Sequence, residues 1–332
     1  MIKNMKIKKN IFIVGTPLQV INAIEAIHHF KLKNIVFVIK FNFIQNNIIQ
    51  IEEQIQAIDK KSEIITIYPS SKGSKFKHYI QTLKYLQKYE YDKFFIGELC
   101  SFCRIIIASL KKEKVYFIDD GTATIVHFER DIKSNNINKF GMREFRFLLY
   151  GFKTQIKDKL NFFTYYDLEK LPDVEVIKNN LEYMKKDFVL NNIDYGSTIF
   201  ILGQPIEIFL DENELAINLN KISKKFIDKE ILYIPHRAQT KKEIENIRLI
   251  SGNIDILEIN MPVERYFLDN GIYPKHVISF ISTALTTTKI LFPKCNVNYI
   301  KIQKPNLSLS DMNYVDFIYF YFEKDDITEI EI

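Results

Sequence analysis

Three short polar segments of the chain carry side chains that could move a proton or bind phosphate. Asp119-Asp120-Gly121 offers a carboxylate that could take a proton from a hydroxyl, although Asp and Gly also form ordinary turns. Pro235-His236-Arg237 places an imidazole beside a guanidinium, and a protonated His236 could give its proton to a phosphate leaving group. Ser282-Thr283 offers two hydroxyls, which suit either a helix cap or a phosphate bound at a helix N-terminus.

Two further positions could contribute to a ligand site. Gly15-Thr16-Pro17 ends an apolar run, where Thr16 suits a helix N-cap and Pro17 the first helical position. Glu264 is either an acid in the first turn of a helix or a carboxylate that binds a ribose diol. The chain has neither the G-x-G-x-x-G nor the P-loop spacing, which disfavours nicotinamide cofactors and P-loop ATP hydrolysis.

Each polar segment must be positioned by the element before it, and apolar runs of strand length alternate with helical patterns. In the first half we expect strands at Ile11–Val14, Asn34–Lys40, Glu63–Tyr68, Lys93–Gly97 and Val115–Asp119, with helices after Thr16 and at Ile44–Ile58, Phe76–Lys88 and Ser101–Lys111. In the second half we expect strands at Thr198–Leu202, Glu230–Ile234, Asp255–Ile259, His276–Phe280 and Cys295–Ile300, with helices at Glu212–Ile227, Thr240–Ile250, Val263–Asp269 and Ala284–Ile290.

This alternation predicts an α/β protein with two doubly wound, Rossmann-like domains that face each other across a cleft. The regular pattern breaks between Phe128 and Phe163, so we place the domain boundary there, with domains at residues 1–155 and 156–332. Ligands of such sheets bind beyond the carboxyl ends of the strands, which is where the polar segments lie.

The composition fits a folded chain that binds a small anion. The 332 residues are 47% hydrophobic and the formal net charge is +5, which suits an anionic ligand or membrane surface but is too weak to indicate nucleic acid. No apolar run has the length of a membrane span, and the basic N-terminal residues precede too short an apolar run for a signal peptide. We therefore expect a cytoplasmic protein, with peripheral contact to the inner membrane left open.

Three cysteines are too few for a disulfide framework and indicate a reducing compartment. Cys100 and Cys103 form a C-x-x-C motif, but no second pair of ligands stands at the spacing of a zinc site. The motif is therefore either a redox pair at a helix start or two buried thiols on one helix face.

Four motifs, in order along nearly the whole chain, resemble the bacterial sialyltransferases of glycosyltransferase family 52. They are Ile13-Val14-Gly15-Thr16-Pro17-Leu18-Gln19, Asp119-Asp120-Gly121-Thr122, Tyr233-Ile234-Pro235-His236-Arg237 and Ser279-Phe280-Ile281-Ser282-Thr283-Ala284-Leu285. The resemblance implies a GT-B-type fold and inverting transfer of sialic acid from CMP-sialic acid. It also implies no metal requirement, and the acceptor would be a terminal galactoside such as that of lipooligosaccharide. The absence of a D-x-D sequence agrees with a metal-free site.

The resemblance also implies roles for particular residues. The first domain would take the acceptor and the second the CMP-sugar donor. His236 would act on the leaving phosphate, and the donor would contact Gly15, Thr16, Pro235, Arg237, Glu264, Ser282 and Thr283. In this chain Pro precedes His236, whereas the wider group of bacterial sialyltransferases has a His-Pro order. Asp119 is the first candidate for the general base and Asp211 the second, followed by Asp120, Glu207 and Glu214.

Other functions stay open on the same scaffold. The chain could use another nucleotide sugar, build a polysialyl chain, or bind a nucleotide or glycan without catalysis. The resemblance favours an α2,3 linkage and a homodimer, and no cofactor besides the donor substrate is expected.

Overall fold

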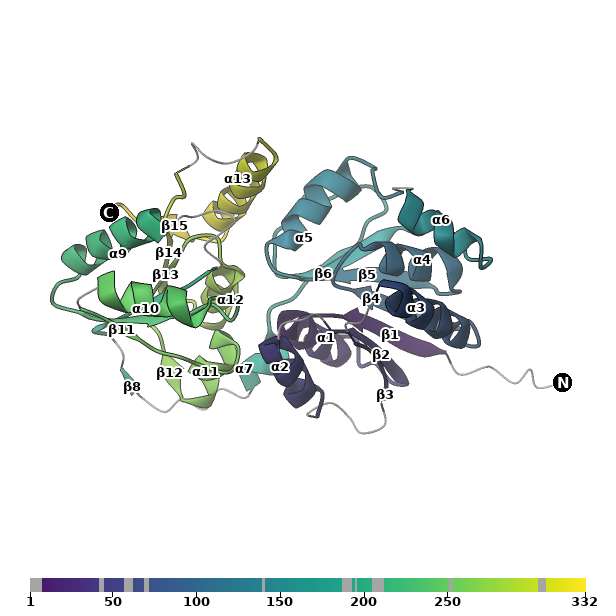
Figure 1. The fold of residues 1–332 in the computed structure, drawn as a ribbon, viewed down its shortest axis with the longest axis horizontal. Coiled ribbons are helices and arrows are strands. Elements are labelled where there is room, and N and C mark those ends of the chain that lie inside the picture. The colour runs from purple at the N-terminus through teal and green to yellow at the C-terminus, as the bar shows by residue number, and fades with distance from the viewer. Residues whose placement is uncertain are drawn as a thin grey trace. The chain divides into compact units, whose positions relative to one another are not determined.

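The computed structural model describes residues 8–41, 45–56, 62–68, 72–138, 141–186, 193–194, 196–204, 212–250, 253–303 and 309–332. The chain divides into two units, Met1–Asn179 and Asn180–Ile332, each built around its own parallel sheet (Figure 1). Two units were expected, but the division falls later than the predicted boundary after residue 155. The reason is that two further strands join the first sheet before the chain leaves it.

The first sheet contains seven parallel strands among the described residues, in the order β3-β2-β1-β4-β5-β6-β7. These strands are β1 (Lys9–Val14), β2 (Ile35–Lys40), β3 (Glu63–Ile67), β4 (Tyr91–Ile96), β5 (Lys114–Ile118), β6 (Leu160–Thr164) and β7 (Val176–Lys178). The helices are α1 (Pro17–His29), α2 (Gln45–Gln56), α3 (Lys72–Leu86), α4 (Ser101–Ser109), α5 (Ala123–Val126), the π-helical turn η1 (His127–Lys133) and α6 (Met142–Leu148).

Both faces of this sheet are buried, which is why its strands are continuous apolar runs. On one face, Phe12 stacks on Phe95 with ring centroids 4.5 Å apart, and this layer packs against Val20 and Ala23 of α1 and Ile51 of α2. Right-handed crossovers place α3 and α4 on the other face, because the strand order reverses between β1 and β4.

The strands β6 and β7 were not predicted. The β6 sequence contains Asn161, a polar residue that interrupts the apolar pattern. Its side chain is accommodated in the sheet because it forms hydrogen bonds with the backbone. Its Nδ2 donates to the carbonyl oxygen of Val115 at 3.1 Å and its Oδ1 accepts from the Glu175 N–H at 3.0 Å. The three-residue β7 is too short to show a periodicity.

The second sheet contains six parallel strands among the described residues, in the order β11-β10-β9-β13-β14-β15. They are β9 (Thr198–Leu202), β10 (Glu230–Ile234), β11 (Ile254–Ile256), β13 (His276–Ser279), β14 (Asn296–Tyr299) and β15 (Thr328–Glu329); β8 (Ile193–Asp194) pairs separately with β12 (Ile272–Tyr273). The helices are α7 (Glu182–Lys186), α9 (Glu212–Lys225), α10 (Lys241–Ile250), α11 (Val263–Asp269), α12 (Thr283–Leu291) and α13 (Leu309–Lys324).

The strands and helices predicted for the second half are present with small shifts at their ends, and the additions are α7, α13, β8, β12 and β15. Two parallel, Rossmann-like sheets of α/β type confirm the predicted fold class. Within the described part of the chain, no helix combines the length and apolar character needed to cross a bilayer.

Candidate functional site

The polar segments of the second unit lie at the point where its strand order reverses. The first strand of the second sheet, β9, runs between β10 and β13, so the residues that follow these three strands share one edge of the sheet. Gly203 and Gln204 follow β9, His236 follows β10, and Ser282 follows β13. The strands that precede His236 and Ser282, β10 and β13, thus lie on either side of β9, about 10 Å apart by two strand spacings. This crevice is the usual ligand position of a doubly wound sheet.

His236 is held in a defined orientation by two backbone contacts. Its own N–H donates to Oε1 of Gln239 at 2.8 Å, and its Nδ1 accepts the N–H of Ala238 at 3.2 Å. Because Nδ1 accepts a hydrogen bond, the proton of the neutral ring lies on Nε2. Burial, followed by the charge of Arg237, lowers the pKa of His236 to about 4. The free protein therefore presents a neutral imidazole whose Nε2–H can donate a hydrogen bond to an anion.

The sequence interpretation took His236 as a protonated group that acts on the leaving phosphate, and that role stays a prediction. The half-buried ring is an uncharged hydrogen-bond donor at neutral pH, because its surroundings disfavour the imidazolium ion.

Gln239 fixes the loop that carries His236 and was missed by sequence reasoning. Its Oε1 also accepts the hydroxyl of Tyr233 at 3.1 Å, so one amide oxygen joins the strand end to the loop. The loop packs directly on Gly203, where an added Cβ would lie 2.4 Å from this oxygen and 2.9 Å from the His236 nitrogen. A glycine after β9 was visible in the sequence, but its contact with a loop far along the chain was not.

The start of α12 offers the expected anion site. Ser282 is the N-cap, and its Oγ accepts the N–H of Ala284 at 3.3 Å. Ser282 and Thr283 are half-buried, and their hydroxyls stand at a helix start, which is a common position for a bound anion. Before the helix, the N–H of Ile281 donates to Oε1 of Gln204 at 3.0 Å, which ties the end of β13 to the end of β9.

Glu264 is fixed beside α12 although it belongs to α11. Its Oε1 accepts the hydroxyl of Thr287 at 2.6 Å, and the side chain is buried. The contact holds a carboxylate in the first turn of α11 next to the helix that begins at Ser282.

In the first unit, Gly15 and Thr16 form the turn between β1 and α1. Thr16 is the predicted N-cap of α1, accepting the N–H of Gln19 at 3.3 Å, and Pro17 begins the helix. The hydroxyl of Thr16 also donates to Oδ1 of Asp120 at 3.0 Å. This bond joins the ends of β1 and β5 and leaves the half-buried Asp120 at the sheet edge.

Asp119 and Asp120 point in different directions, as expected for neighbours at a strand end, and Asp119 points inward. It is completely buried, and its two carboxylate oxygens accept the Thr164 hydroxyl at 2.6 Å and the Tyr165 N–H at 2.9 Å. Burial raises its pKa to about 7, against the lowering effect of these hydrogen bonds. A carboxylate enclosed in this way cannot meet an acceptor hydroxyl without rearrangement, so Asp120 is the better placed of the pair.

The structure says less about the remaining candidates for the general base. Asp211 and Glu207, like Pro205, lie outside the described residues. Glu214 is on α9, where its Oε1 accepts the N–H of Gln303 at 2.9 Å.

Among the described residues, one group could bring metal ligands together: an oxygen of Glu98 and the sulfurs of Cys100 and Cys103 lie within 4.8 Å of one another. However, the ammonium group of Lys40 contacts both Glu98 and Cys100. A cation already paired with these donors opposes binding of a second one.

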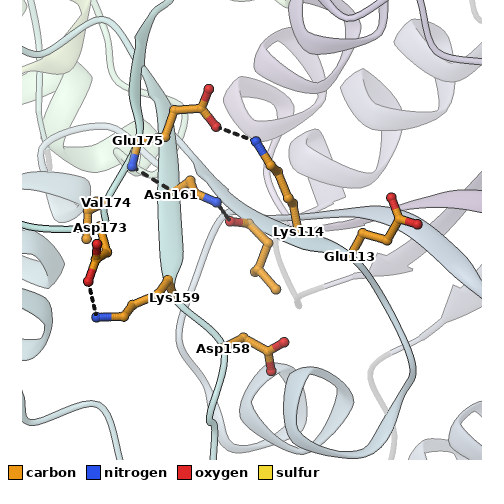
Figure 2. Close-up of a pocket in the computed structure, with 9 residues that line it drawn as sticks. Glu113, Lys114, Asp158, Lys159, Asn161, Asp173, Val174 and Glu175 are labelled. Atoms are coloured by element: carbon orange, nitrogen blue, oxygen red, sulfur yellow. Dashed lines mark hydrogen bonds and ion pairs between the residues drawn. The ribbon is translucent and has the colours of Figure 1, made fainter.

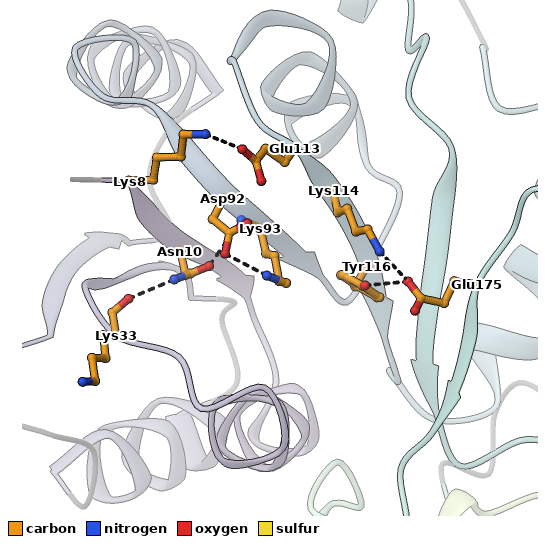
Figure 3. Close-up of polar contacts among 9 residues, drawn as sticks. All are labelled: Lys8, Asn10, Lys33, Asp92, Lys93, Glu113, Lys114, Tyr116 and Glu175. Carbon is orange, nitrogen blue, oxygen red and sulfur yellow. Dashed lines mark hydrogen bonds and ion pairs between the residues drawn. The ribbon is translucent and has the colours of Figure 1, made fainter. Parts of the chain in front are cut away.

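A hollow of about 610 Å³ lies at the opposite edge of the first sheet, where strands begin (Figure 2). Its charges are paired with each other, as in Lys114 with Glu175 at 3.0 Å and Lys159 with Asp173 at 3.5 Å. Figure 3 shows that pairing continues along this edge, with Lys8 bonded to Glu113 and Lys93 to Asp92. The polar segments of the first unit that were singled out in the sequence are at the other edge of this sheet, so we do not assign this hollow to the candidate site.

Comparison with known proteins supports the fold. No protein-family model and no curated protein matches the sequence. Among solved structures, a candidate UDP-N-acetylglucosamine 2-epimerase of Listeria monocytogenes aligns with a TM-score of 0.58 and 12% identity, covering 97% of this chain and 89% of that one. Staphylococcus aureus MnaA, solved with UDP, aligns with a TM-score of 0.57 and 14% identity, covering 90% and 80%. LpCGTa in complex with UDP gives 0.53 and 8%, covering 97% and 84%. The chain is therefore GT-B-like in fold.

Proposed function

We propose that this chain is a glycosyltransferase that uses a nucleotide sugar, and that its donor is CMP-sialic acid. The observation that carries the proposal is the edge of the second sheet, where the Nε2–H of His236 and the capped start of α12 flank the end of β9. These groups donate hydrogen bonds to an anion, and a nucleotide phosphate is the anion that such crevices commonly bind. The GT-B-like neighbours solved with UDP are consistent with a nucleotide ligand.

In this proposal the donor lies along the second unit. The phosphate of CMP accepts hydrogen bonds from Ser282, Thr283 and the first N–H groups of α12. The ribose hydroxyls meet the carboxylate of Glu264, whose Oε1 is already oriented by Thr287. Pro235 shapes the turn after β10, and Arg237 adds positive charge beside His236.

The neutral state of His236 is compatible with this chemistry. A phosphate is a weakly basic leaving group, so it can depart with its negative charge when hydrogen-bond donors are aimed at it. His236 then stabilises charge that develops on the phosphate oxygen, and full proton transfer is not needed. Departure of the phosphate from the sialyl carbon needs little further assistance from the enzyme, because the oxocarbenium-like centre is stabilised by the neighbouring carboxylate of the sugar.

The first unit is proposed to serve the acceptor. Thr16, which follows Gly15 in the turn, positions Asp120 through the hydroxyl contact at 3.0 Å, and Asp120 takes the proton of the attacking hydroxyl. This replaces Asp119 as first candidate, because the carboxylate of Asp119 is enclosed by Thr164 and Tyr165.

The decisive experiment measures release of CMP from CMP-sialic acid with and without lactose, together with the mass of the sugar product. Lactose-dependent release and a sialylated product support the proposal. The same protein is incubated with UDP-N-acetylglucosamine alone. Isomerisation of that sugar nucleotide, without any transfer from CMP-sialic acid, overturns the proposal in favour of an epimerase. Binding of CMP with no turnover of either donor identifies a non-catalytic nucleotide-binding protein.

Removing both hydroxyls at the start of α12 should weaken CMP binding. The double variant Ser282→Ala, Thr283→Ala is expected to lose about 1–3 kcal/mol of binding free energy, since two hydrogen bonds to a charged group disappear. Calorimetry with CMP measures the loss. Thr288→Val is the matched control, because the Thr288 hydroxyl lies buried in the same helix without a hydrogen-bond partner among the described residues. Equal affinity in the double variant and the control would place the phosphate elsewhere.

A further inference from the structure

The C-x-x-C motif lies at the start of α4 with its two sulfurs in contact. Cys100 is the N-cap and Cys103 lies in the first turn, and their Sγ atoms share a weak hydrogen bond at 3.4 Å. Cys100 is half-buried, whereas Cys103 is fully buried. Cys100 is therefore the more exposed residue of the pair, and the sulfur of Cys103 is in contact with its sulfur.

A lysine favours the thiolate form of the more exposed cysteine. Nζ of Lys40 lies 3.1 Å from Sγ of Cys100 and is also paired with Glu98. The hydrogen bond with Cys103 and the charge of Lys40 lower the pKa of Cys100, although burial acts in the opposite direction. The same hydrogen bond and burial raise the pKa of Cys103. The sulfur of Cys100 is thus the better nucleophile, and the sulfur of Cys103 keeps its proton.

We propose that Cys100 and Cys103 are a redox-active pair that forms a reversible disulfide with a small-molecule disulfide, such as oxidised glutathione, as oxidant. The Cys100 thiolate attacks one sulfur of the oxidant, forming a mixed disulfide and releasing one thiolate. Cys103 then loses its proton to solvent and attacks Sγ of Cys100, which forms the internal disulfide and releases the second thiolate. Two cysteines are oxidised and one small disulfide is reduced to two thiols.

A metal site is the main alternative reading of these residues, and the structure argues against it. The ammonium of Lys40 is already paired with Glu98 and the sulfur of Cys100, so a metal ion would have to displace this cation. A dithiol needs such a cation for its reactivity, whereas a zinc site does not.

The pair also lies at the edge of the first sheet where ligands are expected. Lys40 ends β2, and its carbonyl oxygen would lie 3.0 Å from a Cβ added to Gly15. Gly97, just before the motif, lies against the side chain of Gln19, whose Oε1 accepts the Gly15 N–H at 2.7 Å. Oxidation would therefore change charge and packing next to the turn between β1 and α1. The inference does not rest on the proposed transferase function.

The test uses the full chain, purified under reducing conditions and then exposed to oxidised glutathione. We expect the wild type to lose two of its three free thiols and two hydrogen masses, and a peptide map to link Cys100 to Cys103. Dithiothreitol should restore both thiols. Cys103→Ser should stop at a single glutathione adduct on Cys100, because the resolving sulfur is missing. Cys295→Ser is the matched control and should behave like the wild type, because Cys295 is buried and burial raises its pKa to about 12.

The variant Lys40→Met tests whether Cys100 and Cys103 are a reactive pair or two inert buried thiols. Iodoacetamide should modify Cys100 at least about tenfold more slowly in this variant at neutral pH, with the pH midpoint of the rate moved up by about two units or more. An unchanged midpoint overturns the role given to Lys40. Three unreacted thiols in the wild type, or an equivalent of zinc in the protein as purified, overturns the proposal itself.

Discussion

Replacing His236 by alanine is expected to lower kcat for transfer from CMP-sialic acid by about two to four orders of magnitude, the usual range for loss of a group that assists a leaving group. The structure gives the reason. The imidazole is fixed by contacts through Nδ1 and its backbone N–H, which leaves Nε2–H as the hydrogen-bond donor of the neutral ring. CMP affinity should change much less than kcat, because α12 and Glu264 are proposed to provide most of the donor contacts.

Two measurements test whether His236 acts as a neutral donor. His236→Gln keeps an N–H group and should retain more activity than His236→Ala. Because the pKa of His236 in the free protein is about 4, kcat/KM should show no His236-dependent fall as pH rises from 5 to 7. A fall in this range that disappears in His236→Gln would restore the protonated-acid mechanism. Turnover of His236→Ala within a few-fold of wild type would assign the role to another residue.

Asp120→Asn should remove transfer to lactose while slow hydrolysis of CMP-sialic acid continues. Loss of the general base costs about 10²–10⁴-fold in transfer, whereas water needs little activation against so reactive a donor. The contact between Asp120 and the Thr16 hydroxyl should orient the substituted amide as well, so the variant changes the chemistry more than the geometry. Product masses and CMP release, measured in the same reactions, separate transfer from hydrolysis.

Asp119→Asn is the matched comparison, one residue away. We expect its main effect on stability, about 1–3 kcal/mol in the free energy of unfolding, because an amide cannot accept both of the hydrogen bonds that the carboxylate now accepts. If Asp119→Asn folds stably and loses transfer while Asp120→Asn keeps it, the base assignment reverses. If both transfer normally and Asp211→Asn does not, the base lies in the second unit.

The strands that carry the site could be predicted because buried parallel strands are apolar throughout, so each one ends visibly at the first polar residue. The cap of α1 was equally local: Thr16 and Pro17 specify the helix start by themselves. The orientation of Asp119 was not local. It depends on Thr164 and Tyr165, which are brought to β5 by β6, and the sequence of β6 did not resemble a strand.

The protonation of His236 could not be predicted for a similar reason. The protonation state of a histidine that follows a strand cannot be assigned until the groups around it are known. Its tautomer depends on the hydrogen bond from the N–H of Ala238, two residues further along the chain. Its pKa depends on burial in the loop that Gln239 fixes and that packs on Gly203. Residue type indicated the position of the site, whereas its charge state required the tertiary contacts.

The division of the chain after Asn179 has a consequence for biogenesis. Every strand of the first sheet precedes this point and every strand of the second follows it, so neither core needs residues from the other half of the chain. Parallel strands pair slowly during folding, because the connections between them are long. Here each strand finds its partners within one contiguous half of the chain. The first half can therefore complete its core on the ribosome while the second is still being synthesised. We expect heat to melt the halves as separate cooperative blocks, so that a single Tm would not describe the stability of this chain.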